Sequence, residues 1–375
     1  MQLSLNSEQA FSVAPMEIPP EIAQAVQIFV GEPRRRYLLG ATNYAADIAS
    51  VLPVRGIVDD RFAAADFHGI PVIRTADVPE RAVVIATTLG RPVSARRHLR
   101  SHGITNADYF AFHRLCRQQL PQARFWTDFT AAVEQNPARL SRIRRRFCDR
   151  LSLETFDAII NFRLTANLDY LAGFKDRQSE QYFEDFLGLS RDAESFVDVG
   201  GFDGENTSDF ISRCPGFAAV HIFEPDPQNI QRIIDKLPPD NRIRLHTHGL
   251  GDVAGSFRFN SSGSVSSFSD DGEIIVNVRP LDDCSVDGVS FLKMDIEGGE
   301  LAALRGARKT IAKWQPRIAV CVYHQPDDFW TIPEEILSIH DDYRLYLRHY
   351  TEGVVETVMF FVPPESKQNH QYDFA

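Results

Sequence analysis

Three carboxylates stand at or just after the ends of short apolar runs, where a ligand could reach them. Asp198 lies within the run 195–199, Glu224 follows the next apolar run, and Asp295 follows a third. A glycine-rich turn at 200–204 comes directly after the first run, and a backbone without Cβ atoms can turn tightly and let a ligand lie against its amides. The separation of Glu224 from Asp198 is close to the ~20 residues at which an acid reaches the hydroxyls of a ribose. These residue types and spacings indicate a nucleotide-binding site.

The segments around these carboxylates have the pattern of alternating strands and helices. Strands are predicted at 195–199, 219–223 and 289–294, and helices at 207–211 and 301–313. Such alternation is typical of a doubly wound parallel sheet, in which ligands bind at the carboxyl ends of the strands. We therefore expect the three carboxylates to share one edge of a single sheet.

Three stretches resemble the motifs of FkbM-type S-adenosylmethionine-dependent methyltransferases. They are Asp198-Val-Gly-Gly-Phe-Asp-Gly, Phe223-Glu-Pro-Asp and Lys293-Met-Asp-Ile-Glu-Gly-Gly-Glu. The resemblance covers roughly residues 181–363, and the Asp-Ile-Glu-Gly element is its most specific part. It implies an α/β fold of methyltransferase class I: a doubly wound, seven-stranded sheet with a terminal antiparallel strand. It also implies S-adenosylmethionine as the cofactor.

The end of the chain agrees with that fold. After a strand at 317–324 and a helix at 333–340, two strands are predicted at 343–350 and 357–362. A closing antiparallel pair is similar to the methyltransferase sheet, whose last strand inserts antiparallel, whereas dinucleotide-dependent dehydrogenases do not normally end this way.

The resemblance implies a set of donor-binding residues. By position, Asp198 and the glycine turn would meet the amino-acid moiety of the donor, Glu224 its ribose, and the loop at 249–250 its adenine. The alternative for Asp198 is a strand-end acid with a structural role. The predicted cofactor-binding residues are Asp198, Gly200, Gly201, Gly204, Glu224, Gly249, Leu250 and Asp295.

The catalytic candidates follow from the chemistry that the resemblance implies. Methyl transfer from a sulfonium is an in-line displacement, so the protein mainly positions two reactants and handles one proton. Asp295 and Glu297 follow the strand at 289–294, and His324 ends the next strand and titrates near neutrality. These three residues are the predicted catalytic groups, and the choice of base stays open. Glu300 is interpreted only as an acid that suits the first turn of a helix.

Three further residues are predicted to bind substrate: Tyr182, Arg348 and His349. The alternative for Tyr182 is packing, and the alternative for Arg348 and His349 is an edge strand of exposed charge. A required metal is not predicted, because Asp282, Asp283 and Asp295 do not have the spacing of an oxygen-ligand set.

The chain is long enough for more than one domain, and its pattern changes along the sequence. The first glycine turn, Gly40-Ala-Thr-Asn-Tyr-Ala, keeps only the first glycine of a dinucleotide fingerprint, so a structural or docking role is favoured for its domain. We predict a tail at 1–33 with a helix at 21–30, a small Rossmann-like α/β domain at 34–106, a helical bridging segment at 107–189 and a methyltransferase domain at 190–375.

Charge and composition limit the classes of partner and the cellular location that we expect. The formal net charge of −11 argues against broad binding to nucleic acid or anionic membranes. The basic run at 142–146 is the local exception, interpreted as a solvated helix face with phosphate binding as the alternative. The 5 scattered cysteines contain no C-x-x-C and favour reduced thiols, and no apolar stretch reaches the ~18 residues of a membrane helix. A cytoplasmic protein is therefore predicted.

The resemblance implies an O-methyltransferase acting on a hydroxyl of a saccharide, a glycan precursor or a small natural product. A partner protein or self-association through the N-terminal domain is also considered. One alternative is a nicotinamide-dependent oxidoreductase, against which Phe202 within the glycine turn argues. The other is a non-catalytic docking protein in glycan assembly, which the three sheet-edge carboxylates argue against.

Overall fold

The computed structural model describes residues 17–116, 120, 121, 123, 125, 126, 128–260, 267, 268 and 274–364. It divides into two compact units. Unit 1 comprises 1–137, 154–178 and 349–356, and unit 2 comprises 138–153, 179–348 and 357–375. The chain therefore returns to unit 1 twice, the second time between two strands of unit 2.

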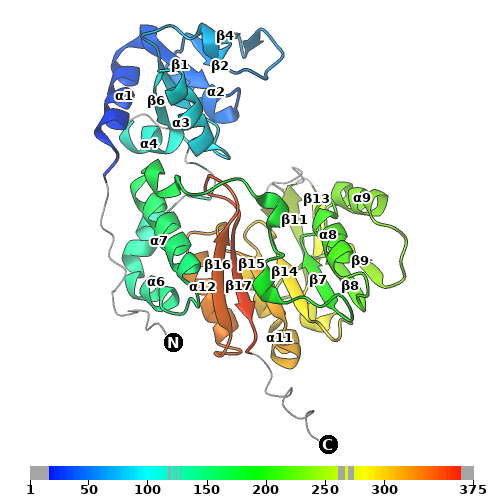
Figure 1. The fold of residues 1–375 in the computed structure, drawn as a ribbon. Helices are drawn as coiled ribbons and strands as arrows, with labels where there is room; N and C mark the ends of the chain where they lie inside the picture. Colours follow the sequence, from blue (N-terminus) through cyan, green and yellow to red (C-terminus); the bar gives the residue numbers. More distant parts are fainter. Residues whose placement is uncertain are drawn as a thin grey trace, which may run out of the picture. The chain divides into compact units, whose positions relative to one another are not determined.

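Unit 1 contains a six-stranded sheet in the order β3-β4-β2-β1-β5-β6 (Figure 1). All pairings are parallel except that of β3 with β4. The strands are β1 (Arg36–Leu39), β2 (Gly56–Val58), β3 (Asp66–Phe67), β4 (Ile70–Ile73), β5 (Val83–Ala86) and β6 (Thr105–Asp108). The helices of unit 1 include α1 (Pro20–Gly31), α2 (Asn43–Val51), α3 (Pro92–Ser101), α4 (Tyr109–Leu115) and α5 (Phe129–Gln135).

Helix α1 confirms the helix predicted at 21–30 and packs into the core of unit 1. Its apolar residues Ile22, Ala25, Val26 and Phe29 are buried in one cluster with side chains of the sheet. The spacing of these residues is that of one face of an α-helix, so this stripe must be covered to be stable. The first 16 residues of the predicted tail lie outside the described part of the chain.

Unit 2 contains a seven-stranded sheet in the order β16-β17-β15-β14-β7-β8-β9. Strand β17 pairs antiparallel with β15 and lies between β15 and β16 (Figure 1). From β15 through β14, β7 and β8 to β9, each strand pairs in parallel with the next. This arrangement confirms the predicted fold class. The strands are β7 (Ser195–Val199), β8 (Ala219–Phe223), β9 (Ile243–His246), β14 (Phe291–Met294), β15 (Arg317–Cys321), β16 (Arg344–His349) and β17 (Thr357–Val362).

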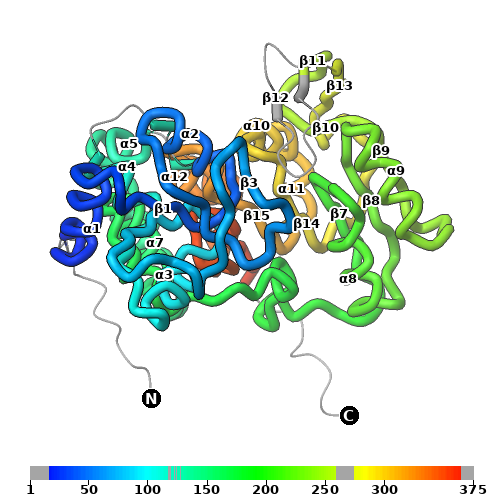
Figure 2. The backbone as a smooth tube through the Cα atoms, turned by 90° about the horizontal axis from the view of Figure 1, so that it is seen from above, coloured from blue at the N-terminus to red at the C-terminus, as the bar shows by residue number. Residues whose placement is uncertain are grey.

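Helices cover both faces of this sheet, as the crossovers of a doubly wound fold require. Helix α8 lies on one side of β7 and β14, and α10 and α11 lie on the other (Figure 2). The helices of this unit are α6 (Pro137–Arg144), α8 (Glu205–Arg213), α9 (Pro227–Lys236), α10 (Glu300–Arg305), α11 (Arg308–Trp314) and α12 (Asp328–Leu337), and α7 (Arg150–Thr165) has residues in both units.

A four-stranded accessory sheet follows β9, in the order β10-β13-β11-β12. Its strands are β10 (Gly249–Leu250), β11 (Gly255–Asn260), β12 (Ser267–Phe268) and β13 (Ile274–Arg279). The alternation of β13, in which Val276 and Val278 are buried and their neighbours are exposed, is typical of a sheet with one solvated face.

Two helices differ from the prediction. The single helix predicted at 301–313 is divided into α10 and α11 at Gly306, where an added Cβ would lie 2.0 Å from the carbonyl oxygen of Gly251. This close backbone contact explains the glycine and the break. The helix predicted from Pro333 begins earlier, at Asp328, and accommodates Pro333 in its interior at the cost of one hydrogen bond.

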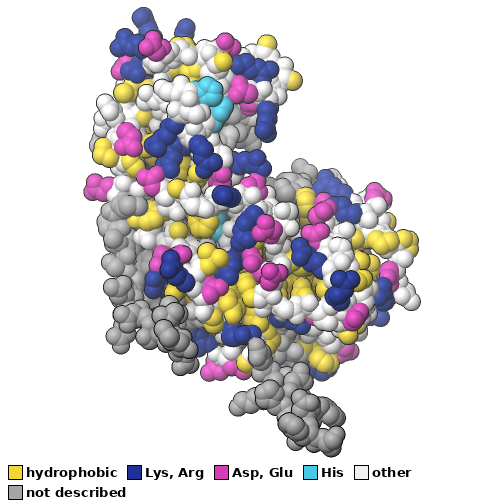
Figure 3. Space-filling model, in the orientation of Figure 1, with side chains coloured by type: hydrophobic (Ala, Val, Ile, Leu, Met, Phe, Trp, Pro, Cys, Tyr) yellow, Lys and Arg dark blue, Asp and Glu magenta, His cyan; other side chains and the backbone are white. Residues whose placement is uncertain are grey.

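Charges of both signs are interspersed on the face of the molecule shown in Figure 3, so the excess of acidic residues is not gathered there. Within the described residues, the helices fall short of the combined length and apolar character needed to cross a bilayer.

Candidate active site

The first two positions of the glycine turn after β7 have no room for a side chain. Gly200 has φ +85°, and a Cβ there would lie 1.9 Å from the carbonyl oxygen of Asp295. At Gly201 an added Cβ would meet Ile222 Cγ2 at 2.4 Å. Gly204 takes a left-handed conformation where α8 begins. The turn is therefore packed directly against the end of β14, so two of the predicted motifs meet through their backbones.

Asp198 lies beneath this turn in a buried ion pair. It is fully buried, and its Oδ1 lies 3.1 Å from Nζ of Lys293, the residue beside it on β14. Lys293 Nζ also donates a 2.7 Å hydrogen bond to the carbonyl of Gly200, and the Thr207 hydroxyl donates to Asp198 Oδ2. Burial by itself lowers the pKa of Lys293, but Asp198 and Asp295 outweigh it and the pKa is raised. The lysine is therefore an ammonium that holds the turn from below.

Lys293 is a functional-site residue that the sequence analysis missed. The signal was a lone charged residue within the apolar run of β14, where an unpaired ammonium would be costly to bury. The structure places Asp198 as its partner, so a contact of Asp198 with the donor stays a prediction, and its observed bonds support the turn.

Glu224 follows β8 and faces the same turn. Its carboxylate accepts hydrogen bonds from the backbone N–H groups of Phe202 at 2.9 Å and Asp226 at 3.0 Å, and lies 3.4 Å from Asn229 Nδ2. Burial is the largest effect on this group and raises its pKa. The predicted ribose-binding acid is thus held beside the glycine turn.

The predicted adenine-binding residues form the short strand β10. Gly249 and Leu250 are buried and pair in parallel with Val278 and Arg279 of β13. Their contact with a nucleotide base stays a prediction.

Four residues at the carboxyl ends of β14 and β15 form what we call the carboxyl-histidine cluster: Asp295, Glu297, Glu300 and His324. His324 Nδ1 lies 2.9 Å from Glu300 Oε1, and its Nε2 lies 3.5 Å from Asp295 Oδ1 and 3.8 Å from Glu297 Oε2. The side chains of His324 and Glu300 are 0% exposed, whereas those of Asp295 and Glu297 are 24% and 20% exposed. All three predicted catalytic residues are therefore brought together, with two carboxylates at the surface of the cluster and the imidazole behind them.

The charges of the cluster follow from its burial and its neighbours. Burial lowers the pKa of His324, but Glu300, Asp295 and Glu297 outweigh it and raise the pKa to about 10. Burial raises the pKa of Asp295, but His324, Lys293 and a hydrogen bond from Tyr182 lower it overall. The pKa of the neighbouring Asp328 is raised to about 8, by burial first and then by Glu300.

Glu300 makes contacts that the helix-dipole interpretation did not predict. It does begin α10, as predicted, but its Oε1 also accepts a 2.8 Å hydrogen bond from the backbone N–H of Ile296 and faces His324. A favourable position on the helix dipole does not require this complete burial. The sequence offered only its place within the Asp-Ile-Glu-Gly-Gly-Glu stretch as a signal.

The predicted substrate-binding residues have different surroundings. Tyr182 joins the cluster, because its hydroxyl donates a 2.7 Å hydrogen bond to Asp295 Oδ2. Arg348 is buried and bonds to Asp149 at 2.7 Å and Ser152 at 3.0 Å. His349 is buried beside the ring of Phe174, and burial, followed by Arg163, lowers its pKa to about 3. For Arg348 and His349, these contacts belong to packing within each residue's own unit, and substrate binding stays a prediction.

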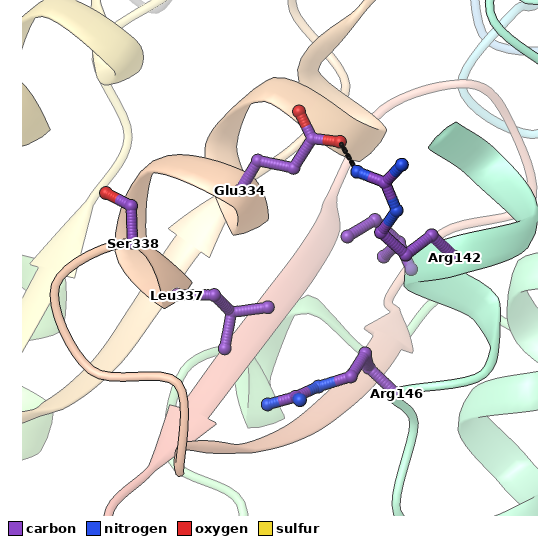
Figure 4. A pocket seen from close by; sticks show the side chains of 6 residues that line it. Arg142, Arg146, Glu334, Leu337 and Ser338 are labelled. Carbon is purple, nitrogen blue, oxygen red and sulfur yellow. Dashed lines mark ion pairs between the residues drawn. The ribbon is translucent and has the colours of Figure 1, made fainter. Parts of the chain in front are cut away.

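The basic run meets another helix of unit 2. Arg142 of α6 and Arg146, which follows this helix, line a pocket with Ile143, Leu337 and Ser338, and Arg142 lies 3.6 Å from Glu334 of α12 (Figure 4). The same Glu334 pairs with Arg139. The arginines therefore link two helices in addition to facing solvent.

The sheet order, with the antiparallel β17 between β15 and β16, is that of the doubly wound α/β fold of methyltransferases. Residues 198–352 match the family model described as the methyltransferase FkbM domain. The segment 198–352 therefore has the sequence pattern of the FkbM methyltransferase family, which confirms the resemblance found in the motifs.

Known proteins that are similar to this chain include the following two. The 2-O-methyltransferase NoeI of Sinorhizobium fredii (strain NBRC 101917 / NGR234) is 28% identical over 143 residues, which are 31% of this chain and 58% of that protein. The crystal structure of methyltransferase FkbM from Methylobacillus flagellatus KT is 28% identical with a TM-score of 0.72, and the match covers 92% of this chain and 94% of that one. The second similarity thus extends well beyond the matched domain.

Proposed function

We propose that this protein transfers a methyl group from S-adenosylmethionine to a hydroxyl of a saccharide, a glycan precursor or a small natural product. The observation that carries the proposal is the direct contact between the glycine turn and the cluster. Gly200 packs against the backbone of Asp295, so a donor lying on the turn would present its methyl group beside the exposed carboxylates. The curated relative NoeI is described as a 2-O-methyltransferase, which favours oxygen as the acceptor atom.

In this proposal, S-adenosylmethionine contacts backbone amides and one acidic side chain. The amides of residues 200–204 would face the amino-acid moiety, and Glu224 would exchange its present bond to the turn for the ribose hydroxyls. Gly249 and Leu250 would border the adenine. Asp198 and Lys293 act from beneath, because their ion pair fixes the carbonyl of Gly200.

The acceptor side consists of Asp295 and Glu297. In the reaction, the acceptor oxygen attacks the methyl carbon, the carbon–sulfur bond breaks with its electron pair left on sulfur, and the hydroxyl proton passes to a base. Asp295 and Glu297 are the partly exposed carboxylates, so they can contact the hydroxyl, orient it and accept its proton. His324 has no exposed side-chain surface, and we assign it a positioning role behind Asp295.

The proposal also includes a cellular location, a substrate class and a possible partner. A cytoplasmic location is supported by the scattered cysteines without a C-x-x-C. A small-molecule or saccharide substrate is supported by the partly exposed carboxylates of the cluster. A role for unit 1 in docking a partner or a second copy rests on its incomplete dinucleotide fingerprint.

The test begins with calorimetric titration of S-adenosylmethionine and its demethylated product into the wild type and Glu224→Ala. We expect micromolar binding, on the order of −8 kcal/mol, that falls sharply in the variant. The matched control is Asp59→Ala in unit 1, which removes the acid after β2 and should leave donor binding unchanged. Labelled methyl transfer to nucleotide sugars then follows, and Asp295→Asn should lower turnover about 10²–10⁴-fold.

The outcome that contradicts the proposal is a folded wild type that binds neither form of the donor. A rise in melting temperature with NAD and none with S-adenosylmethionine would instead favour the nicotinamide-dependent oxidoreductase. Donor binding without transfer to any hydroxyl compound, together with binding of a glycosyltransferase, would favour the docking protein.

A further inference from the structure

The carboxyl-histidine cluster combines three carboxylates with one imidazole. Asp295, Glu297 and Glu300 surround the single imidazole of His324, and Glu300 is fully buried. The nearby ammonium of Lys293 already bonds to Asp198 and to the carbonyl of Gly200. Buried carboxylates in excess of their cations are expensive to desolvate, so this arrangement needs a further positive charge.

Two carboxylate oxygens of the cluster lack a hydrogen-bond donor among the described residues. Oδ1 of Asp295 and Oε2 of Glu300 are buried atoms that accept no hydrogen bond from any residue in the described part of the chain. Buried oxygens of native proteins nearly always have a partner, so an unmatched pair in one cluster points to a missing group. Ligand atoms of Asp295, Glu300 and His324 all lie within 4.8 Å of one another, which is compact enough for one ion.

The distances around His324 suit an ion better than a set of hydrogen bonds. Its Nε2 lies 3.5 Å from Asp295 Oδ1 and 3.8 Å from Glu297 Oε2, both too long for strong hydrogen bonds. Two ligands at these separations, each ~2.1 Å from a common ion, would subtend angles of roughly 110° and 130° at the metal. On the other side of the ring, Nδ1 lies 2.9 Å from Glu300, the contact that typically orients a metal-bound histidine.

We propose that the cluster binds one divalent cation through Asp295 and through His324 Nε2, which releases its proton to solvent as the ion binds, with Glu297 beside the ion and Glu300 orienting the imidazole. One nitrogen with carboxylate oxygens suits a first-row ion such as Mn²⁺. This proposal replaces the sequence-based expectation of a metal-free site, which considered Asp282, Asp283 and Asp295 as the ligand set. Asp282 instead bonds to the backbone N–H groups of Lys309 and Thr310 in α11.

The use of the ion rests on the proposed function, whereas its binding does not. Bound between the exposed carboxylates and the donor turn, it would hold the acceptor oxygen and favour loss of its proton. His324 would then contribute to the reaction through the ion rather than by contact with substrate.

The experiment titrates Mn²⁺ alone into the chelator-treated, full-length protein and follows it by calorimetry and electron paramagnetic resonance. We expect one site per chain with micromolar affinity, weakened at least tenfold in Asp295→Asn and in His324→Gln. Coupling of the bound Mn²⁺ to a nitrogen nucleus should be present in the wild type and absent from any residual binding by His324→Gln. The control is Asp287→Asn, which removes an exposed carboxylate and should bind Mn²⁺ as the wild type does.

A folded wild type that does not bind Mn²⁺, or variants that bind it as tightly as the wild type, would overturn the site. If His324→Gln does not fold, the nitrogen coupling in the wild type and the affinity of Asp295→Asn decide the question. S-adenosylmethionine is titrated separately into the metal-free protein. Donor binding without Mn²⁺ binding overturns only this inference, and Mn²⁺ binding without donor binding overturns only the proposed function.

Discussion

The two large sheets of this chain begin with the same local arrangement and differ in the strand beside it. In both, a glycine with positive φ, Gly40 or Gly200, follows the first strand, and an acid follows the second strand. Asp59 accepts a hydrogen bond from the Ala41 N–H of its turn, as Glu224 does from Phe202. The glycine and the acid are therefore shared features that position a turn, and they do not distinguish a reactive site.

The neighbouring strand makes the difference. In unit 1, β5 is entirely apolar, and the hydroxyl of Thr87 lies 3.2 Å from the carbonyl of Gly40. In unit 2, β14 carries Lys293, whose ammonium donates to the carbonyl of Gly200, and ends at the carboxyl-histidine cluster. A neutral hydroxyl in one sheet thus occupies the place of a buried ion pair in the other.

Removing the group that supports each turn should give the largest contrast. Lys293→Met leaves Asp198 as an uncompensated buried charge, and we expect a loss of about 3–5 kcal/mol in the free energy of unfolding. Thr87→Val removes only a neutral hydrogen-bonding group, and about 1 kcal/mol is expected. Urea unfolding of both variants measures the difference.

Asp198→Asn combined with Lys293→Met tests the reason for that loss. If the cost comes from an unpaired charge, the double variant should be more stable than Lys293→Met alone. Equal losses for Lys293→Met and Thr87→Val would contradict the view that unit 2 has a buried ion pair where unit 1 has a hydroxyl.

Alanine at the two first glycines should give a smaller contrast. Both positions have positive φ, so each substitution should cost about 1–2 kcal/mol in backbone strain. At Gly40 the new Cβ would meet the Thr88 Cγ2 atom at 2.8 Å, which the side chain can relieve by rotating. At Gly200 it would meet the Asp295 carbonyl at 1.9 Å, so the end of β14 must move.

We therefore expect Gly200→Ala to be the less stable variant by about 1–2 kcal/mol or more, and to lose donor binding as well. Thermal unfolding and donor titration of the two alanine variants provide the measurement. Unimpaired donor binding by a folded Gly200→Ala would mean that the turn and the cluster are not coupled through this contact.

These contrasts also show what the sequence could predict. The strands of unit 2 were predictable because apolar runs and turns are local signals, whereas the antiparallel direction of β17 was implied by the resemblance to the methyltransferase family. The contact between Glu300 and His324 was not, because it depends on the pairing of β14 with β15 and on where α10 begins. The return of 349–356 to unit 1 has no compositional signal at all.

The site residues divide in the same way. Spacing identified Glu224 and Asp295, because each follows an apolar run and this position can be read from the sequence alone. Asp198 was also identified, but its burial against Lys293 depends on the neighbouring strand. Residue type and position therefore predicted which side chains gather at the sheet edge, while the partner of each depends on strand register and burial.

The smallest expected effect concerns two neighbouring strands in each unit. In unit 2, β8 and β9 carry His221 and His246, whereas in unit 1 the pairing of β2 with β4 brings together the apolar Ile57 and Val72. His246 lies 3.0 Å from His221 and stacks on Phe223, and burial, followed by His221, lowers its pKa to about 4. Because the folded pKa lies below the unfolded value of ~6.5, the unfolded state binds the proton more readily. This contribution to stability is present above about pH 6.5 and is lost as the pH falls towards about 4.

His246→Phe keeps an aromatic ring on Phe223 and removes the titrating group. After allowance for partial exposure, we expect the wild type to lose about 1–2 kcal/mol more than this variant between pH 7 and pH 4. Denaturant unfolding at several pH values gives both curves, with the exposed His68→Asn of unit 1 as a control that should follow the wild type. Parallel curves for wild type and His246→Phe would mean that the acid sensitivity of unit 2 arises from its carboxylates, and the histidine pair would then add nothing to the contrast between the sheets.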